Sequence, residues 1–285
     1  MSDGTMERAP VVSAASDYAA DVGCPEADLR AMAEAGFTCV HWCHHWNTDF
    51  LYSAAEVQQI ARWLRDFGLQ LLDLHGSHGR EKGWCSPREY ERLAGIELVE
   101  NRIEMTARLG GDAVVMHIPD EPADAGEAAA YWDRMRRTLD VLEPSARLHG
   151  VRIAIENTPG DNFPTMRRLF DAYDPDYLGL CYDSGHGNIA GNGLECLAEA
   201  GERLIAIHLH DNDGVADLHK PPFTGTTDWE RLAAVLAASG YAKPVNLEVG
   251  LRNCGHDDPR RLLRDMFDAA TRIARSVARA RARGD

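Results

Sequence analysis

The 285-residue chain contains neither a long apolar run nor a set of paired cysteines. No stretch approaches the ~20 consecutive apolar residues that a membrane-spanning helix requires, and residues 1–8 lack the apolar core of a secretory signal peptide. The seven cysteines form no CxxC pair and no even-numbered framework, which is typical of reduced thiols. These absences argue against a transmembrane protein and a disulfide-rich secreted domain, and we expect a soluble, cytoplasmic protein.

Positive charge is also scarce, because 30 Lys and Arg residues stand against 45 Asp and Glu residues and the formal net charge is −15. Proteins that bind nucleic acid usually carry a basic face that offsets the repulsion of the phosphates. The basic stretch from Arg272 to Arg283 falls in the last turns of a predicted helix, where arginines complement the helix dipole. The composition therefore favours a small, neutral or metal-bridged substrate over nucleic acid, with no membrane partner.

A glycine-rich phosphate loop and a low-complexity linker are missing as well. A doubly wound sheet that binds dinucleotides needs a glycine-rich turn after its first strand, whereas Gly110-Gly111 precedes a predicted strand and opens no helix. The hydrophobic content of 45% is sufficient for a sizeable core. A barrel of roughly 250 residues is the standard single domain at this size, so we expect one domain over residues 1–285.

What the sequence does have is a repeated feature: six short apolar runs that each end on a residue able to bind a metal. The runs are 71–75, 113–117, 151–156, 178–183, 204–208 and 245–248, and their last residues are His75, His117, Glu156, Asp183, His208 and Glu248. A closed parallel barrel brings the carboxyl-terminal tips of its strands to one face, and catalytic groups lie there.

Helix and strand signals alternate along the whole chain, and the strands are rich in Val, Ile and Leu, as expected when both faces of a sheet are buried. Two further strands are predicted at 11–14 and 37–42. Helices are predicted at 26–35, 54–67, 87–109, 123–148, 164–173, 193–200, 228–240 and 258–281, with start signals at Ser86-Pro87 and Asp228 and stops at Gly68, Gly110 and Gly150. The sequence thus predicts an α/β fold, a single (β/α)8 TIM barrel over about residues 10–281.

Glu156, Asp183, His208 and Glu248 come from the last four predicted strands and form the strongest candidate site. Three carboxylates and one imidazole make a ligand set for a divalent cation such as Mn²⁺, Mg²⁺, Co²⁺ or Zn²⁺. Without a cation, carboxylates gathered within a few ångströms would repel one another and raise each other's pKa. The alternative is that each side chain separately caps a helix or pairs with an arginine, but four such residues in register favour the metal.

Further imidazoles and one carboxylate lie near this set in the sequence. His186 follows the strand-six aspartate by three residues, and Asp217 and His219 lie on the loop after strand seven. His210 leaves the same face of an extended strand as His208, so either of the two could be the ligand. A histidine alone on a loop is usually bonded to a backbone carbonyl, but a position between two ligand strands favours substrate or additional metal binding.

Aromatic residues are concentrated on the predicted loops at the same end of the barrel. Trp42 and Trp46 lie in the histidine-rich segment after strand two, and Trp84 and Phe223 lie on later loops. In one interpretation they form walls of a substrate pocket, because sugars stack their apolar faces on tryptophan. In the other they pack under the barrel rim, and the sequence leaves both interpretations open.

At these positions the chain resembles the xylose isomerase-like barrel superfamily and, within it, the sugar phosphate isomerase/epimerase-type proteins. The matching segments are 155–157, 181–186, 208–214, 217–219 with Gly225 and Asp228-Trp229 downstream, and 246–248. The resemblance implies that Glu156, Asp183, His208 and Glu248 hold a metal. For ketose epimerases of this superfamily it also implies that the two glutamates relay protons on opposite faces of the substrate and that His186 contacts the substrate oxygens.

The chain departs from those epimerases after strand seven, where they usually carry an arginine that binds the sugar and this chain has Asp217-Leu218-His219. That segment resembles the zinc-dependent apurinic endonucleases of the same superfamily, in which nine residues bind three zinc ions. The matching residues here are His75, His117, Glu156, Asp183, His186, His208, Asp217, His219 and Glu248. A phosphodiesterase that cuts DNA at abasic sites is therefore the competing hypothesis, and a metal-dependent lyase or dehydratase on a cyclic polyol is the third.

We predict a divalent-metal-dependent isomerase or epimerase of carbohydrate metabolism that acts on a ketose, aldose or polyol through a metal-stabilised enediolate. Glu156 and Glu248 are the predicted acid and base, and both also bind the metal. Mn²⁺ is the expected cofactor, with Mg²⁺, Co²⁺ and Zn²⁺ as alternatives, at about one ion per chain or more if the other histidines also bind. Substrate contacts are expected from His186, His210 and the four aromatic residues, and a homo-oligomer is compatible with this prediction.

Overall fold

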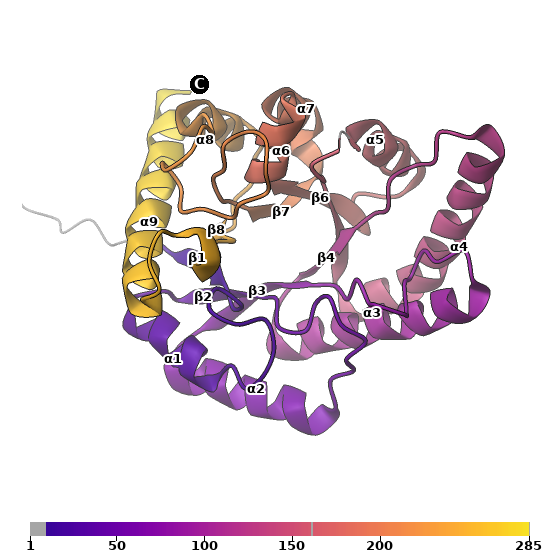
Figure 1. Ribbon diagram of the computed structural model, residues 1–285, viewed down its shortest axis with the longest axis horizontal. Coiled ribbons are helices and arrows are strands. Elements are labelled where there is room, and N and C mark those ends of the chain that lie inside the picture. The colour runs from indigo at the N-terminus through magenta and orange to yellow at the C-terminus, as the bar shows by residue number, and fades with distance from the viewer. Residues whose placement is uncertain (1–9, 161, 285) are drawn as a thin grey trace, which may run out of the picture.

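The computed structural model describes residues 10–160 and 162–284 of the chain. Residues 1–9, in which we predicted no signal peptide, lie outside the described part. Eight strands form a ring with the helices arranged around it (Figure 1). The strands are β1 (Val12–Ala15), β2 (Cys39–Trp42), β3 (Gln70–His75), β4 (Ala113–His117), β5 (Arg152–Glu156), β6 (Leu178–Asp183), β7 (Leu204–His208) and β8 (Val245–Leu247).

Neighbouring strands in the ring are parallel and follow the order β7-β6-β5-β4-β3-β2-β1-β8. The two ends of this sheet meet through a parallel bridge between Leu209 and Leu247. There the N–H of Leu209 donates to the carbonyl of Asn246 at 3.1 Å, and the N–H of Glu248 donates to the carbonyl of Leu209 at 3.1 Å. The strands therefore form a (β/α)8 TIM barrel, which confirms the predicted fold class.

The helices follow the strands in turn and cover the outside of the barrel (Figure 1). They are α1 (Glu26–Glu34), α2 (Ala54–Phe67), α3 (Glu89–Leu109), α4 (Ala125–His149), α5 (Phe163–Ala172), α6 (Ser184–Ala190), α7 (Gly193–Ala200), α8 (Trp229–Ala238) and α9 (Pro259–Arg283), with two 3₁₀ turns, η1 (Gly201–Arg203) and η2 (Leu251–Asn253). Ser53 and Glu56 form a reciprocal capping box at the start of α2. The Asp228 carboxylate caps α8, as predicted, by accepting the N–H of Arg231 at 3.0 Å.

Several boundaries differ from the sequence prediction. A short helix, α6, starts directly after β6. From the sequence we predicted no helix between the end of this strand and residue 193. Its sequence contains glycines at 185 and 187 and has a low helix propensity, but the Asp183 carboxylate caps it by accepting the N–H of His186 at 2.7 Å. Helix α3 begins two residues later than predicted, at Glu89. Strand β8 stops at Leu247, so Glu248 lies just beyond its tip.

The hydrophobic core has two layers. Outside the ring, strand residues such as Val40 and Ile155 pack with residues of the helices in one large cluster. Inside the ring lies a second cluster of mostly small apolar residues: Ala113, Val115, Ala154, Cys181, Ile205 and Ala206. Because side chains alternate along a strand, residues two positions further along point into the carboxyl-terminal mouth of the barrel.

None of the helices in residues 10–160 and 162–284 has the length and apolar character that a bilayer crossing requires.

Candidate metal centre

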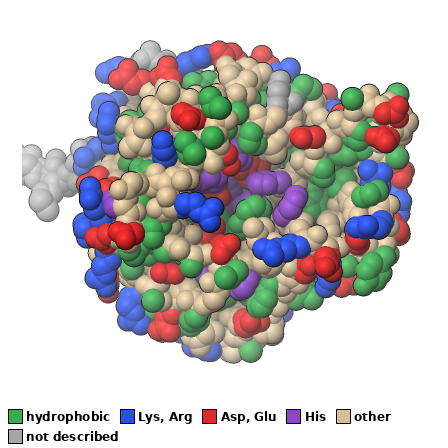
Figure 2. Space-filling view, in the orientation of Figure 1, with side chains coloured by type: hydrophobic (Ala, Val, Ile, Leu, Met, Phe, Trp, Pro, Cys, Tyr) green, Lys and Arg blue, Asp and Glu red, His purple; other side chains and the backbone are tan. Residues whose placement is uncertain are grey.

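The ends of the last four strands bring Glu156, Asp183, His208 and Glu248 together. The first three are the last residues of β5, β6 and β7, and Glu248 follows β8. Each offers one ligand atom, and these atoms lie within 4.8 Å of one another. Nδ1 of His208 is 3.2 Å from Glu156 Oε2 and 3.0 Å from Glu248 Oε2. Histidine side chains are visible in the central hollow of this face of the molecule (Figure 2).

Three of these four side chains are buried, Glu248 is partly exposed, and several of their polar atoms lack a hydrogen-bond partner. Glu156 is 1% exposed, and Asp183 and His208 are 0% exposed. Among the described residues, Glu156 Oε1, Asp183 Oδ2 and both ring nitrogens of His208 have no hydrogen-bond partner. Burial of carboxylate oxygens that lack a partner is costly unless a cation balances their charge. The spacing of 3.0–3.2 Å is also what two ligands keep when each lies about 2.1 Å from a shared ion, so the donor set fits a divalent cation.

The electrostatics of the centre are dominated by the same imidazole. Burial alone would raise the pKa of Glu156, but His208 and His117 hold it well below its usual range. Burial acts in the same direction on Glu248, and His208 again holds the pKa of that carboxyl well below its usual range. The pKa of His208 lies well above its usual value despite burial, because Cys181, Glu248 and Glu156 surround it. Without a cation, the protonated form of His208 between the two glutamates is therefore favoured. Metal binding to His208 would release the additional proton of the imidazole.

A second group of ligand atoms lies at the ends of β3 and β4. His117 Nε2 is 3.1 Å and His75 Nε2 is 3.8 Å from Glu156 Oε2. Burial, together with the nearby His117, lowers the pKa of His75 to about 3, so its imidazole is neutral and able to bind a metal. Glu156 is therefore shared between the first and second groups.

A third group surrounds Asp217, on the loop between β7 and α8. Asp217 Oδ2 is 3.3 Å from Nε2 of both His186 and His219, and the ring of His210 stacks on that of His219 with 4.0 Å between centroids. Burial alone would lower the pKa values of His186 and His219, but nearby carboxylates raise both to about 10. His210 belongs to this group and His208 to the first, so the two histidines that the sequence left as alternatives occupy different positions.

Residues 29–273 match the family model described as xylose isomerase-like TIM barrel. The chain belongs to this family. The uncharacterized protein y4fM of Sinorhizobium fredii is 32% identical over 246 residues, which cover 77% of this chain and 79% of that protein. The family match confirms the resemblance seen in the strand-end segments.

Two further comparisons of this xylose isomerase-like chain are with proteins whose names describe different reactions. A probable endonuclease 4 of Mycobacterium leprae is 27% identical over 163 residues, which cover 52% of this chain and 62% of that protein. A crystal structure of a D-tagatose 3-epimerase-like protein has a TM-score of 0.76 at 19% identity and covers 96% of this chain and 100% of that one. At that identity the likeness shows the shared fold, so the reaction has to be inferred from the residues of the site.

The tryptophans predicted near the site divide into two sets. Trp46 borders the second group, with its ring centroid 4.5 Å from that of His75 and 5.5 Å from that of His117. Trp42 and Trp84 are 1% and 3% exposed and belong to the large hydrophobic cluster. For these two, the structure agrees with the second interpretation, in which the rings pack under the barrel rim.

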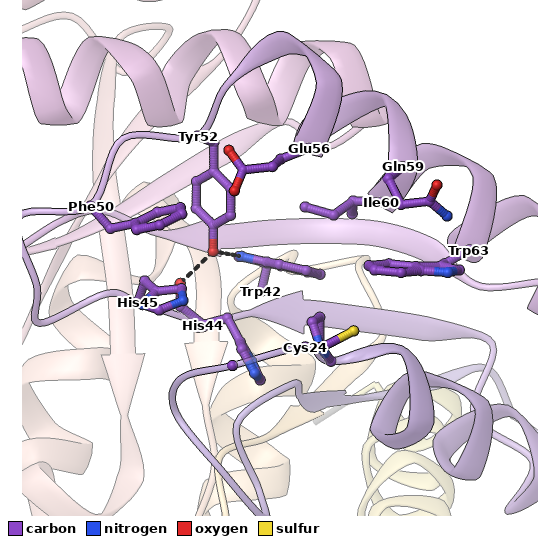
Figure 3. Close-up of a pocket in the computed structure, with 12 residues that line it drawn as sticks. Cys24, Trp42, His44, His45, Phe50, Tyr52, Glu56, Gln59, Ile60 and Trp63 are labelled. Atoms are coloured by element: carbon purple, nitrogen blue, oxygen red, sulfur yellow. Dashed lines mark hydrogen bonds between the residues drawn. The ribbon is translucent and has the colours of Figure 1, made fainter.

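Trp42 lines a separate pocket of about 280 Å³ between the end of β2 and α2 (Figure 3). Its Nε1 donates to the Tyr52 hydroxyl at 3.0 Å, and that hydroxyl donates to the carbonyl of His44 at 2.9 Å. The described residues that line this pocket include none of the nine candidate ligands. Phe223 lies elsewhere, with its ring centroid 5.3 Å from that of Trp229.

The structure adds residues that the sequence reasoning missed. His41 of β2 lies inside the barrel with its ring centroid 4.4 Å from that of His208, and its Nδ1 is 2.6 Å from Asp73 Oδ1. Asp17, on the loop after β1, has its pKa raised to about 6 by burial and then by Glu248. Side-chain alternation was the available signal, because Asp73 lies two residues before the end of β3 and therefore faces the barrel axis.

Proposed function

We propose that this chain is a divalent-metal-dependent isomerase or epimerase that acts on a ketose, aldose or polyol. The observation that carries the proposal is the position of two glutamates beside one imidazole: Oε2 of Glu156 and Oε2 of Glu248 lie 3.2 and 3.0 Å from Nδ1 of His208. Glu156, Asp183, His208 and Glu248 would hold the cation, and Mn²⁺ is the ion we expect.

A divalent cation held by these residues would polarise a substrate carbonyl and its neighbouring hydroxyl and stabilise the negative charge that develops as a C–H proton leaves. One glutamate removes that proton, and the other returns a proton to the opposite face or to the next carbon. Against the effect of burial, His208 keeps the pKa of both carboxyl groups low, so Glu156 and Glu248 are ionised and able to accept the proton. His186 Nδ1 lies 3.5 Å from Glu156 Oε1, where the imidazole can orient the substrate oxygens.

Other properties of the chain support a small sugar or polyol as the substrate. The formal net charge is −15, and Figure 2 shows basic and acidic side chains interspersed around the central hollow on the face that it views. Trp46 lies beside His75 and His117, where its ring can stack on the apolar face of a sugar. The likeness in fold to a D-tagatose 3-epimerase-like protein is compatible with this substrate class. A cytoplasmic location belongs to the same proposal.

Solvent deuterium exchange tests the proposal. The metal-loaded chain is incubated with a panel of ketoses in D₂O, and deuterium at C1 or C3 is measured by mass spectrometry and NMR. We expect exchange with at least one sugar and none with the Glu248→Gln variant. A lack of exchange with every sugar, together with cleavage of a duplex that contains an abasic site, would overturn the proposal. Loss of water from a cyclic polyol would instead identify a lyase or dehydratase.

The second candidate function is a zinc-dependent phosphodiesterase, and the two further groups of ligand atoms favour it. His75, His117 and Glu156 on one side, and His186, Asp217 and His219 on the other, could each hold an ion next to the first centre. Part of the chain is also 27% identical to a probable endonuclease 4. Zinc content distinguishes the two functions, because about one ion fits proton transfer and about three zinc ions fit phosphodiester hydrolysis.

A further inference from the structure

A series of charged and polar side chains leads from the amino-terminal end of the barrel into its buried interior below the proposed metal centre. Most of the barrel interior is filled by small apolar residues, as is usual for this fold. In contrast, Asp73 of β3 pairs with His41 of β2 on one side and with Lys243 on the other, and Lys243 pairs with Asp112. Asp112 precedes β4 and its side chain is 49% exposed, so the series connects the amino-terminal end of the barrel with its interior.

Asp73 is held in its ionised form by this arrangement. Its Oδ1 lies 2.6 Å from Nδ1 of His41, and its Oδ2 lies 3.3 Å from Nζ of Lys243, which is 2.6 Å from Asp112 Oδ1. The ammonium group of Lys243 on one side and the imidazole of His41 on the other leave this carboxyl group in contact with hydrogen-bond donors on both oxygens, an arrangement that favours the carboxylate form. An ionised carboxylate only accepts hydrogen bonds, so Nδ1 of His41 must be the donor.

This hydrogen bond fixes the tautomer of His41. With the proton on Nδ1, Nε2 of a neutral His41 carries a lone pair and is an acceptor. His41 is 0% exposed, and its Nε2 has no partner among the described residues. A buried acceptor without a donor destabilises the folded chain, so an interaction that the metal-loaded state completes is the simplest explanation.

His208 is a candidate donor close to His41. The two ring centroids are 4.4 Å apart, and ligand atoms of His41, His208 and Glu248 lie within 4.8 Å of one another. Nδ1 of His208 is the nitrogen close to both glutamates. The other nitrogen, Nε2, makes no hydrogen bond of normal geometry in the described part of the chain, and the thiol of Cys181 is the other group close to this imidazole.

We propose that Asp73 and His41 are positioning residues for the metal ligand His208. Asp73 orients His41, and Nε2 of His41 accepts the Nε2–H of His208, which fixes the His208 tautomer that leaves Nδ1 free for the cation. This role rests on the proposed metal centre. Side chains that orient a metal-bound histidine typically change metal affinity by about 10- to 100-fold when they are substituted.

Two substitutions of His41 separate its two hydrogen bonds. The amide of His41→Asn occupies the place of Nδ1 and can still donate to Asp73, but it cannot reach His208. The amide of His41→Gln extends to the place of Nε2, where its carbonyl can accept from His208. Asp73→Asn keeps the shape of the carboxyl group and removes its charge. Val115→Ala, in the apolar cluster of the barrel interior, is a matched control for loss of packing.

The experiment is a titration of the chelator-stripped full chain with Co²⁺, which reports both the dissociation constant and the visible absorption spectrum of the bound ion. Thermal unfolding in chelator is measured for each variant. We expect His41→Asn and Asp73→Asn to bind Co²⁺ about 10- to 100-fold more weakly, with an altered spectrum. His41→Gln should recover part of the affinity. Val115→Ala should lower the melting temperature and leave affinity and spectrum unchanged.

The outcomes separate this role from the metal centre itself. If the wild-type chain binds Co²⁺ and both His41→Asn and Asp73→Asn bind it with unchanged affinity and spectrum, the positioning role is wrong and the metal centre stands. If His41→Asn does not fold, Asp73→Asn alone decides, because it changes no volume. If the wild-type chain binds no ion, the proposed metal centre is wrong, and the positioning role falls with it.

Discussion

Asp183 connects the metal centre to a helix start, because its Oδ1 accepts the backbone N–H of His186 at 2.7 Å while its Oδ2 remains without a partner among the described residues. One carboxylate oxygen caps α6, and the other is left for a cation. The cap fixes the side chain in the metal-free chain, which would reduce the conformational entropy lost if the proposed metal binds.

This double role predicts different outcomes for two substitutions of Asp183. Asparagine is as good an N-cap as aspartate, so Asp183→Asn should keep the stability of the metal-free chain while lowering metal affinity by more than about 100-fold. Asp183→Ala should lower metal affinity and also cost about 1 kcal/mol of stability through the lost cap. Denaturant unfolding in chelator, alongside Mn²⁺ titration, measures both. Equal metal binding by wild type and Asp183→Asn would remove Asp183 from the ligand set.

The two proposed proton-transfer residues should be essential for turnover and dispensable for folding. Glu156→Gln and Glu248→Gln should each lower kcat by about 10²- to 10⁴-fold. Both variants should remain folded, although the lost attraction to His208 should lower the free energy of unfolding of the metal-free chain. The exposed Glu199, changed to Gln, is the matched control. A variant at either site with near-normal kcat would rule out the two-glutamate mechanism.

Metal binding should stabilise the folded chain. A ligand that binds the folded state stabilises it by about 2.7 kcal/mol at a concentration one hundred times its dissociation constant. At one hundred times the wild-type dissociation constant, we therefore expect Mn²⁺ to raise the free energy of unfolding of the wild-type chain by about 2.7 kcal/mol and that of Asp183→Asn by less than about 0.4 kcal/mol. Denaturant unfolding with Mn²⁺ and with chelator checks this. Coincident wild-type curves would contradict the presence of a binding site in the folded state.

The barrel and the positions of the strand-end residues proposed as ligands were predictable because both depend on local patterns. Apolar runs of strand length, stop glycines and the residue type at each run's end are properties of a few consecutive residues. Helix α6 was missed because Gly185 and Gly187 lower its helix propensity, and its start depends on the carboxylate of Asp183. The sequence pattern alone does not tell a strand-end ligand from a residue that also caps a helix.

The positions of His210, Trp42 and His41 depended on packing beyond the local sequence. β7 ends at His208, so His210 lies where the chain leaves the strand and joins the residues around Asp217. Trp42 alternates with His41 on β2, and since His41 faces the barrel axis, Trp42 must face the helices. The orientation of the Trp42 side chain could not be assigned before either His41 or Trp42 was known to face the barrel interior.

The buried His44 predicts a pH dependence of stability that is separate from the metal centre. Burial, and then His45, lower the pKa of His44 from 6.5 to about 4. The unfolded chain therefore binds a proton at this residue at a higher pH than the folded chain does, so stability falls as the pH drops from about 6.5 towards 4. Between pH 7 and pH 5 this residue should account for a loss of about 2 kcal/mol.

The variant that isolates this effect is His44→Phe. Nδ1 of His44 has no hydrogen-bond partner among the described residues, so an apolar ring of similar size should be tolerated at pH 7. Denaturant unfolding of wild type and His44→Phe at pH 7 and pH 5 should show a smaller loss of stability in the variant. An identical loss in both proteins would mean that His44 remains free to take up a proton in the folded state.

The central claim is that the ends of β5 to β8 hold one divalent ion that serves proton transfer, and the metal content of the purified chain tests it most directly. Elemental analysis of the wild-type chain, reconstituted with Mn²⁺ or Zn²⁺ and then dialysed, should give about one ion per chain, and Asp183→Asn should give none. A wild-type content near zero would contradict the metal centre. A content close to three zinc ions would contradict the one-ion isomerase and favour the phosphodiesterase.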